Sequence, residues 1–189
     1  ARAPSVMLGD IVEQSRIDAG HMRLHLEVLP VAGMLAEIQG LMHPVARAAG
    51  VEIVVVHDPL ANFVFADHAR LRQCLLNMVG NAVKFSPRGG EVRLNARLSR
   101  EGAGDIVVIE VRDSGIGIEA QEMPAIFRPF GQANDAIGAV YGGAGLGLSI
   151  ARALARDMGG DISVISTPGE GSSFYLRVPA ATARALSAA

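Results

Sequence analysis

Two asparagines and a lysine lie at helical spacing within residues 67–85, a segment rich in Leu, Met and Val. Asn77, Asn81 and Lys84 are four and three residues apart, and at about 100° per residue they share one face of a helix. Asparagine is a poor helix former because its side chain competes for the backbone. An asparagine carbonyl suits Mg²⁺, which also keeps phosphate oxygens as ligands, and a lysine supplies a charge for phosphate. The pattern is typical of a metal and phosphate site, and a solvated helix face is the alternative.

A short acidic and glycine-rich motif directly follows an apolar, strand-like segment. Residues 113–118 have the sequence DSGIGI. A carboxylate at the end of a strand can accept a hydrogen bond from a ligand amine, and two glycines let the ligand approach the backbone. A plain turn capped by Asp113 is the alternative. Gly115, Gly117 and Ala120 also fit a loose dinucleotide-binding fingerprint, which we discount because an aperiodic stretch follows where that fingerprint requires a helix.

A second glycine-rich motif, GGAGLGLS at residues 142–149, stands immediately before an Ala-, Leu- and Ile-rich segment. Glycines ahead of a helix leave its first N–H groups free, and these groups bind phosphate together with the helix dipole. The Gly-Lys-Ser/Thr of a Walker A motif is absent. An amide-bearing helix, an amine-accepting carboxylate and a phosphate-type turn in one chain together predict an ATP site that lacks a P-loop.

Hydrophobic periodicity predicts the elements that must position these motifs. Helices are expected at residues 5–19, 31–49, 67–85 and 146–158, with a kink at Pro44 and an N-cap at Asp67. Strands are expected at residues 22–28, which Pro30 ends, and at 51–56, 91–98, 105–112, 161–166 and 173–178. Residues 113–144 show no period, and a loop of that length is usually functional. This mixture of elements predicts one layered α+β domain.

Composition narrows the class of protein. The chain has 189 residues, 17 Lys and Arg against 19 Asp and Glu, and one cysteine, Cys74, among apolar neighbours. The length suits a single domain with a buried core, and a formal charge of −2 without basic runs argues against nucleic-acid binding. One cysteine excludes a disulfide framework and favours a core thiol in a reducing compartment. Neither a membrane span nor a signal peptide is expected. Because the chain starts at Ala1 within a helical pattern, we expect it to be a piece of a longer protein.

With these motifs in place, the chain resembles the ATP-binding domain of sensor histidine kinases, within the wider superfamily of gyrase, Hsp90, histidine kinase and MutL ATPases. NMVGNAVKFS (77–86) is similar to the family's asparagine box, and DSGIGI and GGAGLGLSIA (142–151) are similar to its two glycine boxes. IFRPFGQ (126–132) resembles its phenylalanine box. The ending GGDISVISTPGEGSSFYLRVP and the segment SRIDAG also match, so the likeness covers nearly the whole chain.

The resemblance implies an α/β, or α+β, two-layer sandwich of the Bergerat type. A mixed β-sheet would be covered on one face by the three helices at 31–49, 67–85 and 146–158. Residues 1–20 would be a helical remnant, the C-terminal end of a dimerisation and phosphoacceptor helix, residues 21–180 the ATP-binding domain, and residues 181–189 a flexible tail. Residues 127–142 would form a lid over ATP, with Phe127 and Phe130 as its hinge.

The resemblance also implies roles for individual residues. Asn81 would ligate Mg²⁺, Asn77 and Lys84 would lie beside the phosphates of ATP, and Phe85 would stack on adenine. Asp113 would accept the exocyclic amine of adenine, which predicts a preference for ATP over GTP because guanine presents an oxygen there. The remaining ATP-binding residues would be Gly115, Gly117, Ile118, Phe130, Gly143, Gly145, Leu146, Gly147, Leu148 and Ser172.

The implied function is the ATP- and Mg²⁺-binding part, located in the cytoplasm, of a protein-histidine kinase in two-component signalling. Its partners would be a dimerisation domain that carries the phosphoacceptor histidine and a response-regulator receiver domain, in a homodimeric parent that is either anchored to a membrane or not. This part of the parent would make no nucleic-acid or membrane contact. No histidine of the chain has the sequence context of the acceptor, so we identify no catalytic residue and expect no self-phosphorylation. Water activation is disfavoured because Asn77 stands where hydrolytic members have glutamate. Ala139, Val140 and Ala144 leave open a degenerate regulatory module or a phosphatase-biased parent.

Overall fold

The computed structural model describes residues 23–101, 104–131 and 145–181. The expected helix at 5–19, the remnant at 1–20 and the tail from residue 182 onwards lie outside these ranges. The same holds for Gly143, Ala144 and the Ala139-Val140 pair. Within the described part of the aperiodic segment, residues 114–131 form turns and no helix or strand.

A five-stranded mixed sheet forms one layer of the molecule. Its spatial order is β2 (Glu52–His57), β4 (Glu91–Glu101), β5 (Gly104–Asp113), β7 (Gly171–Pro179) and β6 (Asp161–Thr167). β2 runs parallel to β4, and the other neighbours are antiparallel. The parallel pair requires a crossover connection, and the chain makes it through a strand and a helix between residues 57 and 91.

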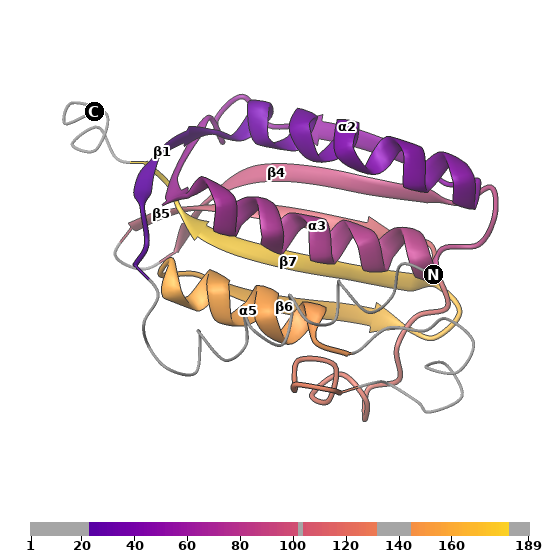
Figure 1. Cartoon of the computed structure of the whole chain (residues 1–189). Coiled ribbons are helices and arrows are strands. Elements are labelled where there is room, and N and C mark those ends of the chain that lie inside the picture. Colours follow the sequence, from indigo (N-terminus) through magenta and orange to yellow (C-terminus); the bar gives the residue numbers. More distant parts are fainter. Residues whose placement is uncertain (1–22, 102–103, 132–144, 182–189) are drawn as a thin grey trace.

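Three helices form the second layer on one face of this sheet (Figure 1): α2 (Val31–Ala49), α3 (His68–Phe85) and α5 (Gly147–Asp157). The core lies between the layers, and its largest fully buried side chains are Leu35, Ile38, Leu71, Leu75, Met78, Leu94, Ile109, Leu146, Ile150, Leu154, Ile162 and Leu176. The predicted two-layer α/β sandwich with three helices on one face is confirmed. None of the described helices is long and apolar enough to cross a membrane.

A second, two-stranded sheet pairs β1 (Leu26–Pro30) with β3 (Phe63–Asp67) in antiparallel register. The prediction of a strand at 22–28 was therefore wrong in its bounds. Leu26 pairs with Asp67, where β3 gives way to α3, so residues 23–25 have no residue of β3 to pair with. The strand does end at Pro30, as predicted, because Pro30 forms the last pair and then precedes the first residue of α2. α2 also continues through Pro44 as one helix.

The start of α3 is fixed by Asp67, as predicted. Its Oδ1 accepts the Arg70 N–H at 3.1 Å and its Oδ2 accepts the His25 N–H at 2.8 Å. Burial raises the pKa of Asp67, but these backbone donors outweigh it, and the net pKa lies below the ordinary value. One carboxylate thus caps α3 and holds the chain ahead of β1.

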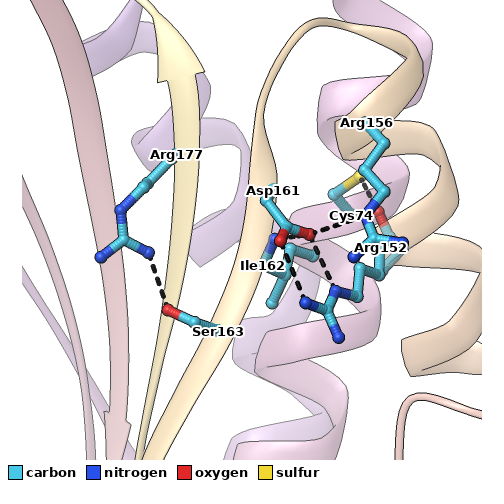
Figure 2. A network of polar contacts seen from close by, with 8 residues as sticks. Cys74, Arg152, Arg156, Asp161, Ile162, Ser163 and Arg177 are labelled. Atoms are coloured by element: carbon cyan, nitrogen blue, oxygen red, sulfur yellow. Dashed lines mark hydrogen bonds and ion pairs between the residues drawn. The ribbon is translucent and has the colours of Figure 1, made fainter. Parts of the chain in front are cut away.

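Cys74 lies in the interface between α3 and α5. Its thiol donates to the Ala151 carbonyl oxygen at 3.2 Å (Figure 2). Burial raises the pKa of the thiol to about 12, so it remains protonated at neutral pH and unreactive. The prediction of a core cysteine is confirmed.

Candidate functional site

Asp113 ends β5 as a buried carboxylate, only 6% exposed. Its Oδ1 accepts the N–H groups of Gly115 at 2.8 Å and Ser172 at 3.2 Å. Its Oδ2 has no hydrogen-bond partner among the described residues. Burial raises the pKa of Asp113, and the two backbone donors offset only part of this effect. One buried acceptor oxygen is therefore left over, which fits a ligand that brings its own donor.

Ser172 lies opposite Asp113 in the register of β5 and β7 and is also buried. The Ser166 hydroxyl donates to the Gly171 carbonyl oxygen at 2.8 Å, so in its 2.9 Å contact with Ser172 it accepts. Ser166 also accepts the Ile118 N–H at 2.8 Å. The Ser172 hydroxyl therefore donates its proton to Ser166, and its oxygen accepts no hydrogen bond from the described residues.

At three of the predicted site glycines, a side chain would collide with the backbone of neighbouring segments, so the fold itself requires glycine there. A Cβ on Gly115 would lie 2.6 Å from the Phe85 carbonyl oxygen. Gly117 has φ +70°, and a Cβ there would overlap the carbonyl oxygen of Thr167. Gly145 has φ +68°, and a Cβ there would lie 2.9 Å from the Gly131 carbonyl oxygen. These close approaches bring the turn after β5 against the end of α3 and against the connection from β6 to β7.

Asn77 joins α3 to the first residue of α5. Its Nδ2 donates to the Gly147 carbonyl oxygen at 2.9 Å. A Cβ on Gly147 would meet the Asn77 side chain at 3.6 Å, an ordinary van der Waals distance. Unlike the three glycines above, Gly147 is not forced by the packing of the chain.

Asn81, one turn further along α3, is half-buried, and its side chain makes no hydrogen bond with the described residues. Its amide oxygen is a neutral hard donor of the kind that binds Mg²⁺ alongside phosphate oxygens and water. The described residues contain no group of three or more His, Cys, Asp or Glu able to hold a metal. The residues present therefore fit a magnesium ion held mainly by phosphate and by one protein ligand.

Lys84 and Phe85 form the end of the same helix. The Lys84 ammonium lies 4.6 Å from the centre of the Phe85 ring, and burial lowers the pKa of the lysine. A cation over an aromatic face is attracted to it. Lys84 and the ring of Phe85 are therefore held together on the same end of α3 as Asn81.

The first turn of α5 has no side-chain N-cap. The residue ahead of it, Leu146, is 1% exposed, and Leu148 packs against the core. These two predicted site residues hold the helix start in place through apolar contacts. The first N–H groups of an uncapped helix are available to an anion.

The segment 126–131 lies beside α5. Phe127 is partly buried, and the guanidinium carbon of Arg152 stands 4.6 Å from the centre of its ring. Phe130 is 68% exposed and has φ +60°, a conformation that a bulky residue rarely adopts. The two phenylalanines of the predicted hinge thus have different surroundings.

The structure brings the three sequence motifs together around the second half of α3. The turn after β5 contacts Phe85, and the start of α5 is bonded to Asn77. Sequence reasoning missed Ser166, whose hydrogen bonds join the turn after β5 to β7, because nothing in an alternating strand marks that serine. It also missed the contacts of Arg152 with Asp161 and Phe127.

Comparison with known proteins agrees with this geometry. The model of the family described as histidine kinase-, DNA gyrase B- and HSP90-like ATPase matches residues 66–182. The chain is 38% identical to the sensor protein GacS of Pseudomonas syringae pv. syringae over 94% of its length, and 36% identical to the autoinducer 2 sensor kinase/phosphatase LuxQ of Vibrio parahaemolyticus over 92%. It spans about a fifth of the length of these relatives.

Solved structures give the same result. Full-length ShkA in complex with AMPPNP superposes with a TM-score of 0.81 and 36% identity, over 94% of this chain and 36% of that one. The catalytic domain of the histidine kinase ThkA superposes with a TM-score of 0.69 and 25% sequence identity. This match covers 83% of this chain and 97% of that one. The buried acceptor on β5, the amide-bearing face of α3 and these matches lead to one conclusion: the chain belongs to the histidine kinase-, DNA gyrase B- and HSP90-like ATPase family, among the ATP-binding domains of sensor histidine kinases.

Proposed function

We propose that this chain is the catalytic domain of a protein-histidine kinase, which binds ATP with Mg²⁺ and donates the γ-phosphoryl group to a histidine on a separate dimerisation domain. The observation that carries the proposal is the buried Asp113 carboxylate, whose Oδ2 has no partner among the described residues, in a turn whose Gly115 lies against the Phe85 carbonyl at the end of α3.

Adenine would bind through Asp113. Its free Oδ2 would accept the exocyclic amine, while Oδ1 stays bonded to the backbone of Gly115 and Ser172. Guanine carries an oxygen at that position, which would face the carboxylate without a proton between them. This arrangement supports binding of ATP in preference to GTP, with the Ser172 hydroxyl as a further acceptor and Phe85 stacked on the base.

The phosphates would lie between α3 and the start of α5. Asn81 would hold the magnesium ion, Asn77 and Lys84 would lie beside the phosphate oxygens, and the uncapped N-terminus of α5 would face them. When bound, Mg²⁺ neutralises negative charge on the triphosphate. The glycines Gly143, Gly145 and Gly147 would let the backbone approach this charge.

The reaction would be an in-line transfer. The bond between the γ-phosphorus and the β,γ-bridging oxygen breaks, a bond to a ring nitrogen of the acceptor histidine forms, and ADP leaves. The protein would contribute position and charge stabilisation. The Asn77 amide has no useful basicity to activate water, which favours transfer over hydrolysis.

The parent protein would supply the other parts. We propose that residues 1–20 end a dimerisation helix, that residues 21–180 form the ATP-binding domain, and that residues 181–189 are a tail. The parent would be a homodimer that works in the cytoplasm, where ATP is available, and would pass phosphate to a receiver domain. A phosphatase-biased parent is the second candidate, favoured by Ala139 and Val140 and by the 36% identity to LuxQ, which is named a sensor kinase/phosphatase.

Calorimetry on an Asn81→Ala variant tests the magnesium role. We expect ATP affinity in Mg²⁺ to fall at least tenfold, and affinity in EDTA to stay the same, because the amide would act only through the metal. Asn95→Ala, on the sheet face away from the helices, is the matched control and should bind like the wild type. Equal loss in EDTA would contradict the assignment.

Label transfer tests the reaction. With [γ-³²P]ATP and Mg²⁺, the chain alone should stay unlabelled, and a supplied dimerisation domain should become labelled in an acid-labile, base-stable form. Nucleotide binding without transfer to any supplied acceptor would favour the degenerate regulatory module. Steady release of phosphate by the isolated chain would favour hydrolysis.

A further inference from the structure

Arg152, on the second turn of α5, has an unusually fixed guanidinium. Its Nε donates to Asp161 Oδ1 at 2.8 Å and a terminal nitrogen donates to Oδ2 at 3.0 Å, a two-point pairing that sets the plane of the group. Figure 2 shows Asp161 at the start of β6, between Arg152 and Arg156. Arg156 donates to the same carboxylate through one bond of 3.1 Å.

The other partner of this guanidinium is the ring of Phe127. The guanidinium carbon of Arg152 lies 4.6 Å from the centre of the Phe127 ring, within the range of a cation–π contact. Phe127 is also partly buried against the core. Arg156 contacts no aromatic ring of the described residues, so the two arginines share Asp161 and only Arg152 also contacts Phe127.

Phe127 connects this ion pair to the start of α5. Between Ala125 and Gly131 the chain forms tight turns, in which the Arg128 N–H donates to the Ala125 carbonyl and the Gly131 N–H donates to the Arg128 carbonyl, each at 2.9 Å. The carbonyl of Gly131 and the backbone of Phe130 then lie against Gly145, at a spacing that only a glycine allows. Moving Phe127 would therefore move the backbone that packs on Gly145, two residues before α5.

We propose that Arg152 is a positioning residue for nucleotide binding: oriented by Asp161, it holds Phe127 and through it the backbone against Gly145, and so fixes the turn that leads into α5. The inference rests on the proposed function, in which the phosphates face that turn. Arg152 acts through Phe127 and does not itself touch the nucleotide.

Calorimetry with MgATP compares Arg152→Gln with Arg156→Gln. Both variants remove one arginine from Asp161, and only the first removes the contact with Phe127. We expect Arg152→Gln to weaken MgATP binding about fivefold and Arg156→Gln to change it less than about twofold. Equal effects of the two variants would overturn the proposal, because the loss would then follow the ion pair and not the ring contact.

Variants of the ring test the same link independently of the arginine. Phe127→Leu should weaken binding as much as Arg152→Gln, Phe127→Tyr should retain wild-type affinity, and the Phe127→Leu/Arg152→Gln double variant should lose no more than either single one. Additive losses would overturn the proposal. These variants also decide the matter if Arg152→Gln fails to fold.

Hydrogen exchange without nucleotide separates this inference from the proposed function. Amides of residues 126–131 should exchange faster in Arg152→Gln than in Arg156→Gln, while α3 and the main sheet exchange alike in both. A general loss of protection would show a merely structural role and overturn the proposal. Failure of the wild type to bind ATP would overturn the proposed function together with this inference. Wild-type ATP binding with unchanged exchange at 126–131 would overturn the inference alone.

Discussion

At the scale of single residues, Asp113 combines burial with a hydrogen bond that the described part of the chain leaves unmade. It is buried, and one of its two oxygens accepts two backbone N–H groups while the other has no partner in the described part of the chain. A buried charge with an unmade hydrogen bond costs stability. Burial accordingly raises the pKa of Asp113, and a nucleotide amine would remove this cost on binding.

Replacing Asp113 by asparagine should separate stability from binding. Asparagine keeps an oxygen for the N–H groups of Gly115 and Ser172 and removes the buried charge, so we expect an unfolding temperature at neutral pH no lower than that of the wild type. Its amide would face the adenine amine donor to donor, so ATP affinity should fall at least tenfold. Calorimetry and thermal unfolding measure the two effects.

The matched control for this variant is Asp105→Asn, at the exposed opposite end of β5, where a 3.8 Å pair with Arg100 is largely solvated. It should leave ATP binding unchanged. If Asp113→Asn binds ATP with wild-type affinity, the base is recognised elsewhere and the adenine assignment is wrong.

At the scale of the elements, the packing of the chain requires glycine in one of the two glycine-rich motifs and tolerates a Cβ in the other, as Gly117 and Gly147 show. Gly117 has positive φ and abuts the Thr167 carbonyl, whereas Gly147 lies in the first turn of α5 with ordinary contacts to Asn77. The first glycine fixes how the turn after β5 packs on the connection between β6 and β7. The second could carry a Cβ at ordinary van der Waals distances from the Asn77 side chain, so the packing of the described residues does not require glycine there.

Alanine at each position should therefore give opposite results. Gly117→Ala should lower the free energy of unfolding by more than about 2 kcal/mol, because the backbone must shift and adopt a strained φ. Gly147→Ala should leave that free energy unchanged or raise it by up to about 1 kcal/mol, yet weaken MgATP binding. Chemical denaturation and calorimetry check both. A destabilised Gly147→Ala, or a Gly117→Ala as stable as the wild type, would contradict this division.

The helices and strands also show which element bounds can be predicted from sequence patterns. α3 could be predicted to within one residue because Asp67 caps it and its apolar positions repeat every three to four residues. β1 could not, because its length depends on where its partner β3 turns into a helix. Residue type and spacing indicated the three motifs of the candidate site. They gave no indication of Ser166, which faces Ser172 across a strand pair, or of Arg152, whose partners come from a strand and a distant turn.

At the scale of the whole molecule, buried and paired carboxylates set the response to acid. Hydrogen bonds from Arg152 hold the pKa of Asp161 well below its usual range, and the net pKa of Asp67 is also lowered. Both groups stabilise the fold above the ordinary carboxyl pKa of about 4, and this stability is lost as pH falls from there towards their folded-state values. Asp113 acts in the opposite sense, because its raised pKa favours the folded state at low pH.

An Asp161→Asn variant should isolate one of these contributions. At pH 7 we expect its free energy of unfolding to be lower than that of the wild type by about 1 kcal/mol, the upper end for a solvent-screened ion pair, since Asp161 and Arg152 are 38% and 29% exposed. The difference should shrink as pH falls below about 4, where the wild-type carboxyl begins to lose its advantage. Urea denaturation from pH 7 to pH 3 measures it, and a constant difference would contradict the ion-pair origin.

Among the described residues, the last strand in sequence, β7, is not an edge strand of the sheet. β7 lies between β5 and β6, so it supplies hydrogen bonds to both neighbours. During synthesis, β5 and β6 leave the ribosome before β7. Until β7 follows, the edge of each strand that pairs with β7 has no hydrogen-bond partner. The nascent domain therefore closes its sheet only once residues 171–179 have emerged, and a chain stalled before that point presents chaperones with an unfinished sheet.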